Sequence, residues 1–116
     1  MKATRIIVAI AAICVAGYFV LSNLQARRIA PLNNEAMALL EQKKFAEARD
    51  LLERARRIAP NNPIINKNLG AAYEGLDDTT KAIEAYERSL SANPNQPDLR
   101  EAVAELKAIL QGKSQE

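Results

Sequence analysis

The side chains of this chain that could do chemistry are pairs of carboxylates at helical spacing. Glu84 lies three residues before Glu87, and Glu101 lies four residues before Glu105. At these spacings two carboxylates share one face of a helix, where one could act as a general acid and the other as a general base. No further catalytic group accompanies them, and we interpret both pairs as solvated helix surface.

Nucleophilic catalysis and metal binding lack the residues they need. The chain has no histidine, so neither Ser89 nor Ser91 has the imidazole base that commonly activates a hydroxyl nucleophile. The single cysteine, Cys14, lies inside an apolar run, and the sequence DDTT at 77–80 lacks the ligand spacing of a calcium loop. We therefore predict a protein that is not an enzyme and that uses no cofactor, no metal and no small-molecule substrate.

The charge balance argues against a nucleic-acid partner. The formal net charge of +2 comes wholly from Lys2 and Arg5, because the chain from Arg27 onward has 14 basic and 14 acidic residues. Nucleic-acid binding normally requires a basic excess. One local basic concentration is interpreted as a solvated helix face, with contact to an anionic lipid surface as the alternative. It consists of Arg27, Arg28, Arg54, Arg56 and Arg57.

An uncharged segment near the N-terminus predicts a membrane anchor. No charged residue occurs from 6 to 26, and the apolar run at 6–24 is 19 residues long. As an α-helix at 1.5 Å per residue it would reach about 28 Å, close to the ~30 Å hydrocarbon core of a bilayer. Because backbone amides inside a bilayer must bond to one another, the segment is expected to be helical, and we assign residues 1–28 to a single-pass signal anchor.

Three fates compete for this segment, namely retention, cleavage as a secretory signal, and lipidation. A signal peptidase site needs small residues, but LQA at 24–26 places Leu24 where one is required. In AAIC at 11–14, bulky Ile13 stands directly before the cysteine that a lipoprotein signal would modify. We therefore expect an uncleaved anchor, with cleavage as the alternative.

The orientation of the anchor follows less directly from its flanks. Lys2 and Arg5 precede the apolar run, and Arg27 and Arg28 follow it, so the positive-inside rule is nearly balanced. Because long hydrophilic domains cross a membrane largely regardless of their charge, we expect a bacterial inner-membrane protein with its C-terminal domain outside the cytoplasm. The reverse orientation stays open.

Small residues on the apolar run could pack against another membrane helix. Ala9, Ala12 and Ala16 fall at helical spacing, where small side chains let a second helix approach closely. The alternative is that alanine simply fills a moderately hydrophobic anchor.

The remainder of the chain contains an internal repeat. The sequence ERARRIAPNNP at 53–63 returns in altered form as ERSLSANPNQP at 87–97, an offset of 34 residues. A period of this length built from two helices is typical of a solenoid. The identical pairs are Ala48 and Ala82, Glu53 and Glu87, Arg54 and Arg88, Pro60 and Pro94, Asn61 and Asn95, and Pro63 and Pro97.

Apolar residues at three-to-four spacing predict five helices after the anchor, over 32–44, 45–59, 63–76, 79–92 and 97–112. Pro60 and Pro94 are expected to end the second and the fourth. Asn62 should cap the third helix with Pro63 at its first position, and the aspartates at 77–78 should turn and cap the chain before the fourth. Gly112 is expected at the end of the fifth.

The segment NLGAAYEGLDDTTKAIEAYERSLSANPNQ at 68–96 resembles a tetratricopeptide repeat. The residues at the spacings of that family are Leu69, Gly70, Tyr73, Ala82, Tyr86 and Pro94. The unit at 29–62 is similar but looser, because Glu35 stands where Leu69 stands in the second unit. The positions that fit are Leu32, Ala36, Leu39, Phe45, Ala48, Leu52, Ala55 and Pro60.

The resemblance implies a short helical solenoid, and with the transmembrane helix predicted from the apolar run it gives an all-α fold. It covers residues 29–110 and gives repeats at 29–62 and 63–96, followed by a capping helix and tail at 97–116. Small residues such as Gly70 and Ala48 would let paired helices approach, while Tyr73 and Tyr86 would fill gaps between units. Since two repeats and a cap are few, we expect the isolated residues 29–116 to be marginally stable.

The resemblance also implies a protein-binding groove lined by the first helix of each unit. Members of the family that bind chaperone tails hold a terminal carboxylate with Lys, Asn and Arg, and here only Asn68 matches, since Asp98 and Ala102 stand at the basic positions. That activity is not expected. The groove candidates are Asn33, Met37, Leu40, Glu41, Lys67, Asn68, Ala71 and Glu74. Each has an ordinary alternative as a helix-surface residue.

Two functions follow as hypotheses. In the first, the protein is an accessory or scaffold subunit of an integral membrane complex, held there by residues 6–24 and by contacts of the repeats. In the second, it is a tethered binding module whose groove captures a soluble or exported protein or peptide.

Overall fold

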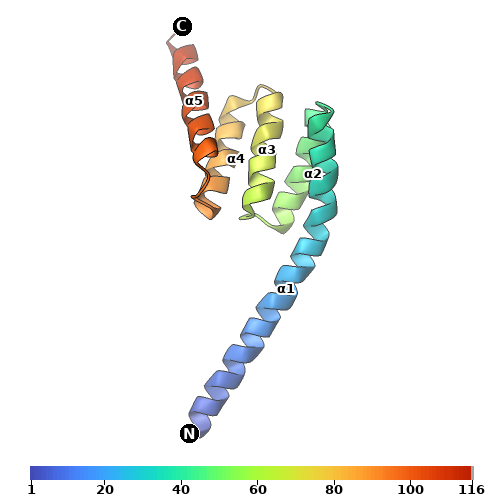
Figure 1. Ribbon diagram of the computed structural model, residues 1–116, viewed down its shortest axis with the longest axis vertical. Coiled ribbons are helices and arrows are strands. Elements are labelled where there is room, and N and C mark those ends of the chain that lie inside the picture. Colours follow the sequence, from blue (N-terminus) through green and yellow to red (C-terminus); the bar gives the residue numbers. More distant parts are fainter. Residues whose placement is uncertain (116) are drawn as a thin grey trace.

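The computed structural model describes residues 1–115, and within them the protein is entirely helical, without strands. The helices are α1 (Lys2–Glu41), α2 (Phe45–Ile58), α3 (Pro63–Gly75), α4 (Thr79–Ala92) and α5 (Pro97–Ser114). The N-terminal half of α1 projects alone, whereas its C-terminal half packs with the other helices as a row of antiparallel neighbours (Figure 1). The all-α fold predicted from the sequence is confirmed.

α1 is longer than the sequence predicts. Instead of an anchor followed by a separate helix from residue 32, one helix of 40 residues runs through Pro31. The proline ring removes the backbone donor that would bond the carbonyl of Arg27, which locally weakens the helix without ending it. In Figure 1, α1 changes direction where it joins the packed helices. The apolar N-terminal segment and the first predicted repeat therefore share one continuous helix.

The two hairpin turns have the same geometry, 34 residues apart. Lys43 and Asp77 each have a φ of 59°. The amide of Lys44 bonds the Leu39 carbonyl at 2.9 Å, as that of Asp78 bonds the Tyr73 carbonyl at 2.9 Å, which is the long hydrogen bond of a Schellman motif. The Asp78 side chain then caps α4 by accepting from the Lys81 amide, as predicted.

The corner between α2 and α3 follows the sequence closely. Asn62 caps α3 by accepting from the amides of Ile64 and Ile65 at 3.0 and 3.1 Å, and Pro63 occupies the first turn. Asn66 is fully buried, and its amide group donates to the carbonyls of Pro60 and Asn62, both at 2.9 Å. The cap and the buried amide hold the end of α2 against the start of α3.

The corner between α4 and α5 is fixed differently. α4 ends at Ala92, before Pro94, as predicted. Gln96 precedes α5 without capping it, and its amide group instead donates to the carbonyls of Ser89 and Asn93 at 3.3 and 2.8 Å. Gly112 does not end α5, which continues to Ser114 because glycine is only mildly unfavourable inside a helix.

Small residues stand at the helix crossings, as the repeat predicts. Ala36, Ala48 and Ala82 are completely buried. Gly70 lies beneath the aromatic ring of Tyr86, so that a Cβ at this position would overlap the ring. Gly75 has the same relation to Phe45, from the preceding unit. The tight spacing of α3 and α4, and of α3 and α2, therefore depends on missing side chains.

The core forms two clusters joined by Tyr73. One cluster lies among α1, α2, α3 and α4 around Leu52, Ile65 and Leu69, and the other lies between α4 and α5 around Tyr86 and Val103. Tyr73 packs against both. The protein is thus a stack in which each unit buries its apolar face against its neighbour, and α5 covers the apolar face of α4 at the C-terminal end.

Candidate interaction groove

The sequence places eight candidates along the first helices of the two units, and the structure brings three of them into contact. Asn68 of α3 donates to the side-chain carbonyl of Asn33 on α1 at 2.8 Å, and Asn33 donates to the Met37 sulfur at 3.6 Å. Met37 keeps 45% of its surface exposed. The contact between Asn68 and Asn33 links α3 to α1.

The other candidates divide between exposed and occupied positions. Glu41 and Lys67 are exposed, and Ala71 is half-buried. Leu40 packs against the core cluster. Glu74 is exposed but accepts a hydrogen bond from the Tyr86 hydroxyl at 2.8 Å, which ties it to α4. Leu40 and Glu74 therefore have structural roles besides any part in a groove.

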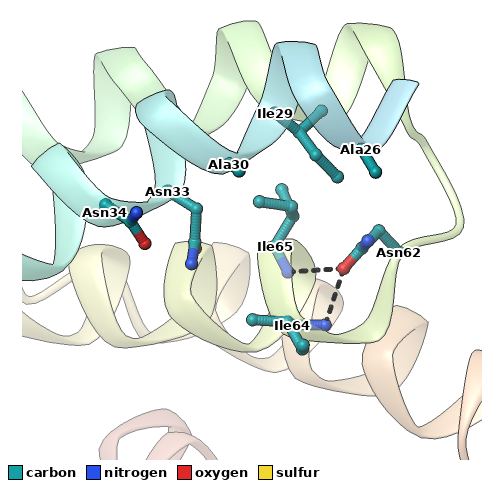
Figure 2. A pocket seen from close by; sticks show the side chains of 8 residues that line it. All are labelled: Ala26, Ile29, Ala30, Asn33, Asn34, Asn62, Ile64 and Ile65. Carbon is teal, nitrogen blue, oxygen red and sulfur yellow. Dashed lines mark hydrogen bonds between the residues drawn. The ribbon is translucent and has the colours of Figure 1, made fainter. Parts of the chain in front are cut away.

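An open cavity of about 230 Å³ lies where α1 passes the start of α3. Figure 2 shows its lining, with Asn62 turned back to the amides of Ile64 and Ile65. Its α1 residues are Ala26, Ile29, Ala30, Asn33 and Asn34, and its α3 side is formed by Asn62, Ile64 and Ile65. Its walls are mainly apolar, so it suits an apolar side chain better than a charged one.

Sequence reasoning missed most of this cavity. Ile64 is 59% exposed although it is a large apolar residue. The signal is present in the sequence, because Ile64 falls outside the stripe formed by Ile65 and Leu69 and has no place in the core. Ala26 was missed for another reason, since it was assigned to the anchor rather than to the first repeat.

Several groups that could do chemistry are engaged in structure, whereas Glu101 and Glu105 are exposed on α5. Ser89 is fully buried, and its hydroxyl donates to the Pro63 carbonyl at 2.8 Å. Glu87 pairs with Lys107, and Glu84 lies 4.0 Å from Arg88. Among residues 1–115, no three side chains of His, Cys, Asp or Glu are grouped to hold a metal ion.

Two tyrosine hydroxyls are held by carboxylates. Burial, with a hydrogen bond of 2.8 Å to Glu53 and the charge of that carboxylate, raises the pKa of Tyr73 to about 12. Burial also opposes ionisation of Glu53, but hydrogen bonds from Arg56 and Tyr73 outweigh it and lower the pKa of that carboxyl. Burial and the Glu74 carboxylate likewise raise the pKa of Tyr86. These groups stabilise the stack and have no arrangement suited to catalysis.

α1 is long and apolar enough to cross a membrane, with a mean hydropathy of 2.3 over its most apolar 18 residues, none of them buried in the protein. A secretory signal sequence passes the same test. Ala9, Ala12 and Ala16 are exposed along this part of α1, and their packing against another membrane helix stays a prediction.

The geometry defines an α-solenoid of two helical hairpins and a closing helix. Residues 39–110 match the sequence profile of the tetratricopeptide repeat family, and the chain belongs to that family. The N-terminal domain of stress-induced protein-1 from C. elegans has a similar structure, with 29% identity and a TM-score of 0.61 over 68% of this chain and 67% of that one. The resemblance inferred from the sequence is confirmed. The family generally consists of protein-interaction modules rather than enzymes.

Curated relatives match about half of the chain. RANBP2-like and GRIP domain-containing protein 1 of Homo sapiens is 36% identical over 66 residues, and E3 SUMO-protein ligase RanBP2 of Pan troglodytes is 35% identical over 66 residues. These matches cover 57% of this chain but only 4% and 2% of the relatives. The similarity therefore concerns a module within much larger proteins.

Proposed function

We propose that this protein is a non-enzymatic scaffold or accessory subunit of a membrane protein complex, anchored by residues 6–24. The observation that carries the proposal is the continuity of α1, which extends from the apolar segment into the first repeat without a loop. A flexible linker would let the repeats search a large volume, whereas a helix restricts their position and rotation. A restricted position suits a subunit that meets its neighbours in one geometry.

The proposal includes a location and a division of the chain. The repeats lie outside the cytoplasm at a bacterial inner membrane, with the anchor at 1–28, repeats at 29–62 and 63–96, and the closing helix at 97–116. Partners are integral membrane proteins, met by the anchor and by the repeats. A cysteine introduced at Ser114 in a Cys14→Ser background tests the orientation, because a membrane-impermeant maleimide should label it in intact spheroplasts.

Purification in mild detergent tests the scaffold function. Integral membrane subunits should co-purify in fixed stoichiometry and stay bound at high salt. Replacing residues 6–24 by an unrelated apolar helix of equal length keeps the helical phase of α1, so loss of the partners would place the contact in the bilayer. Recovery of no membrane subunit with the unaltered chain would contradict the proposal.

A second function, capture of a soluble or exported protein or peptide in the groove, is favoured by one observation. Met37 and Ile64 are exposed apolar residues near the contact between Asn33 and Asn68. Such residues can serve as anchor points for a partner's apolar side chains. If capture is the function, residues 29–116 alone should bind one partner, and Met37→Ser or Lys67→Glu should abolish binding while the exposed Ala108→Ser, on α5, should not.

A further inference from the structure

The corner between α2 and α3 lies beside the end of the anchor. Asn62, Ile64 and Ile65 line one cavity together with Ala26 and Ile29 of α1. Ala26 is the last residue of the uncharged segment, and Arg27 follows it. In Figure 1 this corner and the corner between α4 and α5 lie on the side of the stack from which the anchor leaves. A bilayer spanned by α1 would therefore face the first turn of α3.

This corner and the adjoining part of α1 carry cations outside any ion pair of the described residues, and of these Arg57 donates through Nε to the backbone carbonyl of Glu53 at 3.4 Å. Arg27, Arg28 and Arg57 are exposed, as is Lys67, and no ion pair within residues 1–115 engages any of them. Arg56 differs, because its guanidinium binds Glu53 through bonds of 3.0 and 2.7 Å. Arg54 also differs, since it lies with Glu35 and Asp50 on the outer face of the first hairpin.

The equivalent corner of the second repeat is not basic. Residues 53–67 contain four basic residues and one acidic residue, whereas residues 87–101, 34 positions later, contain two basic and three acidic residues. The two segments have the same place in their repeats, so the fold does not require the difference. The basic corner is the one next to the anchor.

The same corner exposes an apolar side chain. Ile64, in the first turn of α3, is 59% exposed and lines the cavity, and in Figure 2 it lies below Ile65, which points toward α1. Exposed apolar residues flanked by Arg and Lys are the pattern by which protein surfaces bind at the headgroup layer of a membrane. Charge, exposed apolar surface and position thus indicate the same partner.

We propose that the corner at 57–67 docks on the membrane surface together with Arg27 and Arg28 of α1. Arg27, Arg28, Arg57 and Lys67 then lie against anionic phospholipid headgroups, and Ile64 lies within the headgroup layer. This docking rests on the proposed function only in requiring that α1 spans the membrane. Docking fixes the tilt of the repeats, because the corner then contacts the membrane at a second point besides α1. The groove would then be presented at a defined height above the bilayer.

The test uses the full chain with Cys14→Ser and Ile64→Cys, labelled with a polarity-sensitive fluorophore and reconstituted in phosphatidylcholine vesicles with or without phosphatidylglycerol. A nitroxide attached to the lipid headgroup should quench the probe more strongly in anionic vesicles. The difference should vanish between about 0.1 M and 1 M salt, as the Debye length falls from ~10 to ~3 Å. Ile109→Cys is the matched control, since Ile109 is 50% exposed near the far end of α5, and it should not be quenched.

Charge variants sharpen the test. Arg57→Gln should lower the ratio of docked to undocked protein about fivefold, the effect expected of one cation near an anionic surface. Arg54→Gln, on the outer face, should leave the ratio unchanged. Equal quenching in neutral and anionic vesicles, or equal quenching of probes at 64 and 109, would overturn the docking.

Protection of native Cys14 separates this proposal from the anchor itself. In the otherwise unaltered chain, Cys14 should resist a water-soluble maleimide in intact vesicles. Protection without quenching at position 64 overturns the docking and leaves the anchor intact, whereas a reactive Cys14 overturns both.

Discussion

The ring of Tyr86 lies over Gly70 more closely than any side chain at that position would allow. Gly70→Val should therefore separate α3 from α4 and lower the free energy of unfolding by about 1 to 3 kcal/mol. Gly112 gives the matched control, because a Cβ there meets no neighbour within 4 Å. Gly112→Ala should stabilise α5 by ~0.5 to 1 kcal/mol, measured by urea unfolding of residues 29–116. Equal effects of the two variants would contradict the assigned packing.

Ionisation of the Tyr73 hydroxyl should lower the stability of the stack at alkaline pH. Because the pKa of Tyr73 is raised from 10.0 to about 12 in the folded protein, its contribution is complete below pH 10 and is lost as the pH rises from 10 to 12. Tyr73→Phe should cost about 1 kcal/mol at neutral pH and should lose less stability than the wild type above pH 10. Urea titrations of both proteins from pH 8 to about 12 measure the difference, and parallel curves would contradict it.

The partner carboxylate acts at the acidic end. The pKa of Glu53 is lowered from 4.5, so the stability that it contributes is present above that value and is lost as the pH falls through the folded pKa. The acidic loss should therefore be smaller in a Glu53→Gln variant. The acidic difference for Glu53→Gln and the alkaline difference for Tyr73→Phe report on the same contact, whereas Tyr86, whose pKa is also raised, adds to the alkaline loss in both the wild type and Tyr73→Phe.

Lys43 has a positive φ that lysine tolerates poorly. It occupies the position after the cap of α1, where glycine is favoured, while Asp77 occupies the equivalent position after α3. Lys43→Gly should raise the free energy of unfolding by up to about 1 kcal/mol, and Asp77→Gly should change it less, because aspartate adopts this conformation more readily. Thermal unfolding of the two variants checks the order, and a loss of stability in Lys43→Gly would refute it.

Local signals in the sequence predicted the residues whose roles are local. Asn62 and Asp78 were assigned correctly as caps and Pro63 as the first residue of α3, because a cap depends on atoms two or three residues away. The contact between Asn33 and Asn68 and the exposure of Ile64 were not predicted, since they depend on how α1 and α3 cross. The positions of residues on the first helix of each repeat therefore gave groove candidates, but they did not show which of these residues contact one another.

At the scale of helices, the repeat predicted all four later elements, but the extent of α1 was not predicted. The apolar run and the first repeat were predicted as separate helices, although residues 25–31 between them contain no glycine and only one proline. A single proline removes one hydrogen bond and permits a bent, continuous helix. The predicted boundary followed the change from apolar to polar composition. Whether the backbone stays helical depends instead on the helix propensity of each residue.

The isolated stack should be only marginally stable. Six of the fourteen most buried apolar residues are alanines, which remove little apolar surface from water on folding. Each unit also buries its face only against its neighbour. Residues 29–116 should unfold cooperatively with a midpoint near the usual ~45 to 65 °C range, measured by circular dichroism. A monomer that melts above about 70 °C would contradict this expectation.

At the scale of the whole molecule, one polar contact is repeated along the stack. Glu53 of α2 accepts from Tyr73 of α3, and Glu87 of α4 pairs with Lys107 of α5. Both residues of the second pair lie 34 positions after those of the first. The glutamate at the equivalent position therefore binds the next helix in each unit. In the second pair the partner is Lys107 of α5, and a charged residue suits a helix that ends the stack.

The continuity of α1 between the proposed anchor and the repeats makes the rotation of the repeats testable. Two alanines inserted after Gln25 would turn the stack by about 200° about the axis of α1, whereas four would turn it by about 400° and so return it to within about 40° while raising it ~6 Å. If the protein is a subunit that meets its partners in one geometry, co-purification of membrane subunits should fail with two alanines and be largely restored with four. Unchanged helix content and membrane retention of both variants serve as the control. Equal recovery of partners with both insertions would indicate a freely tethered module instead, because a groove that captures soluble partners has no required rotation about the anchor.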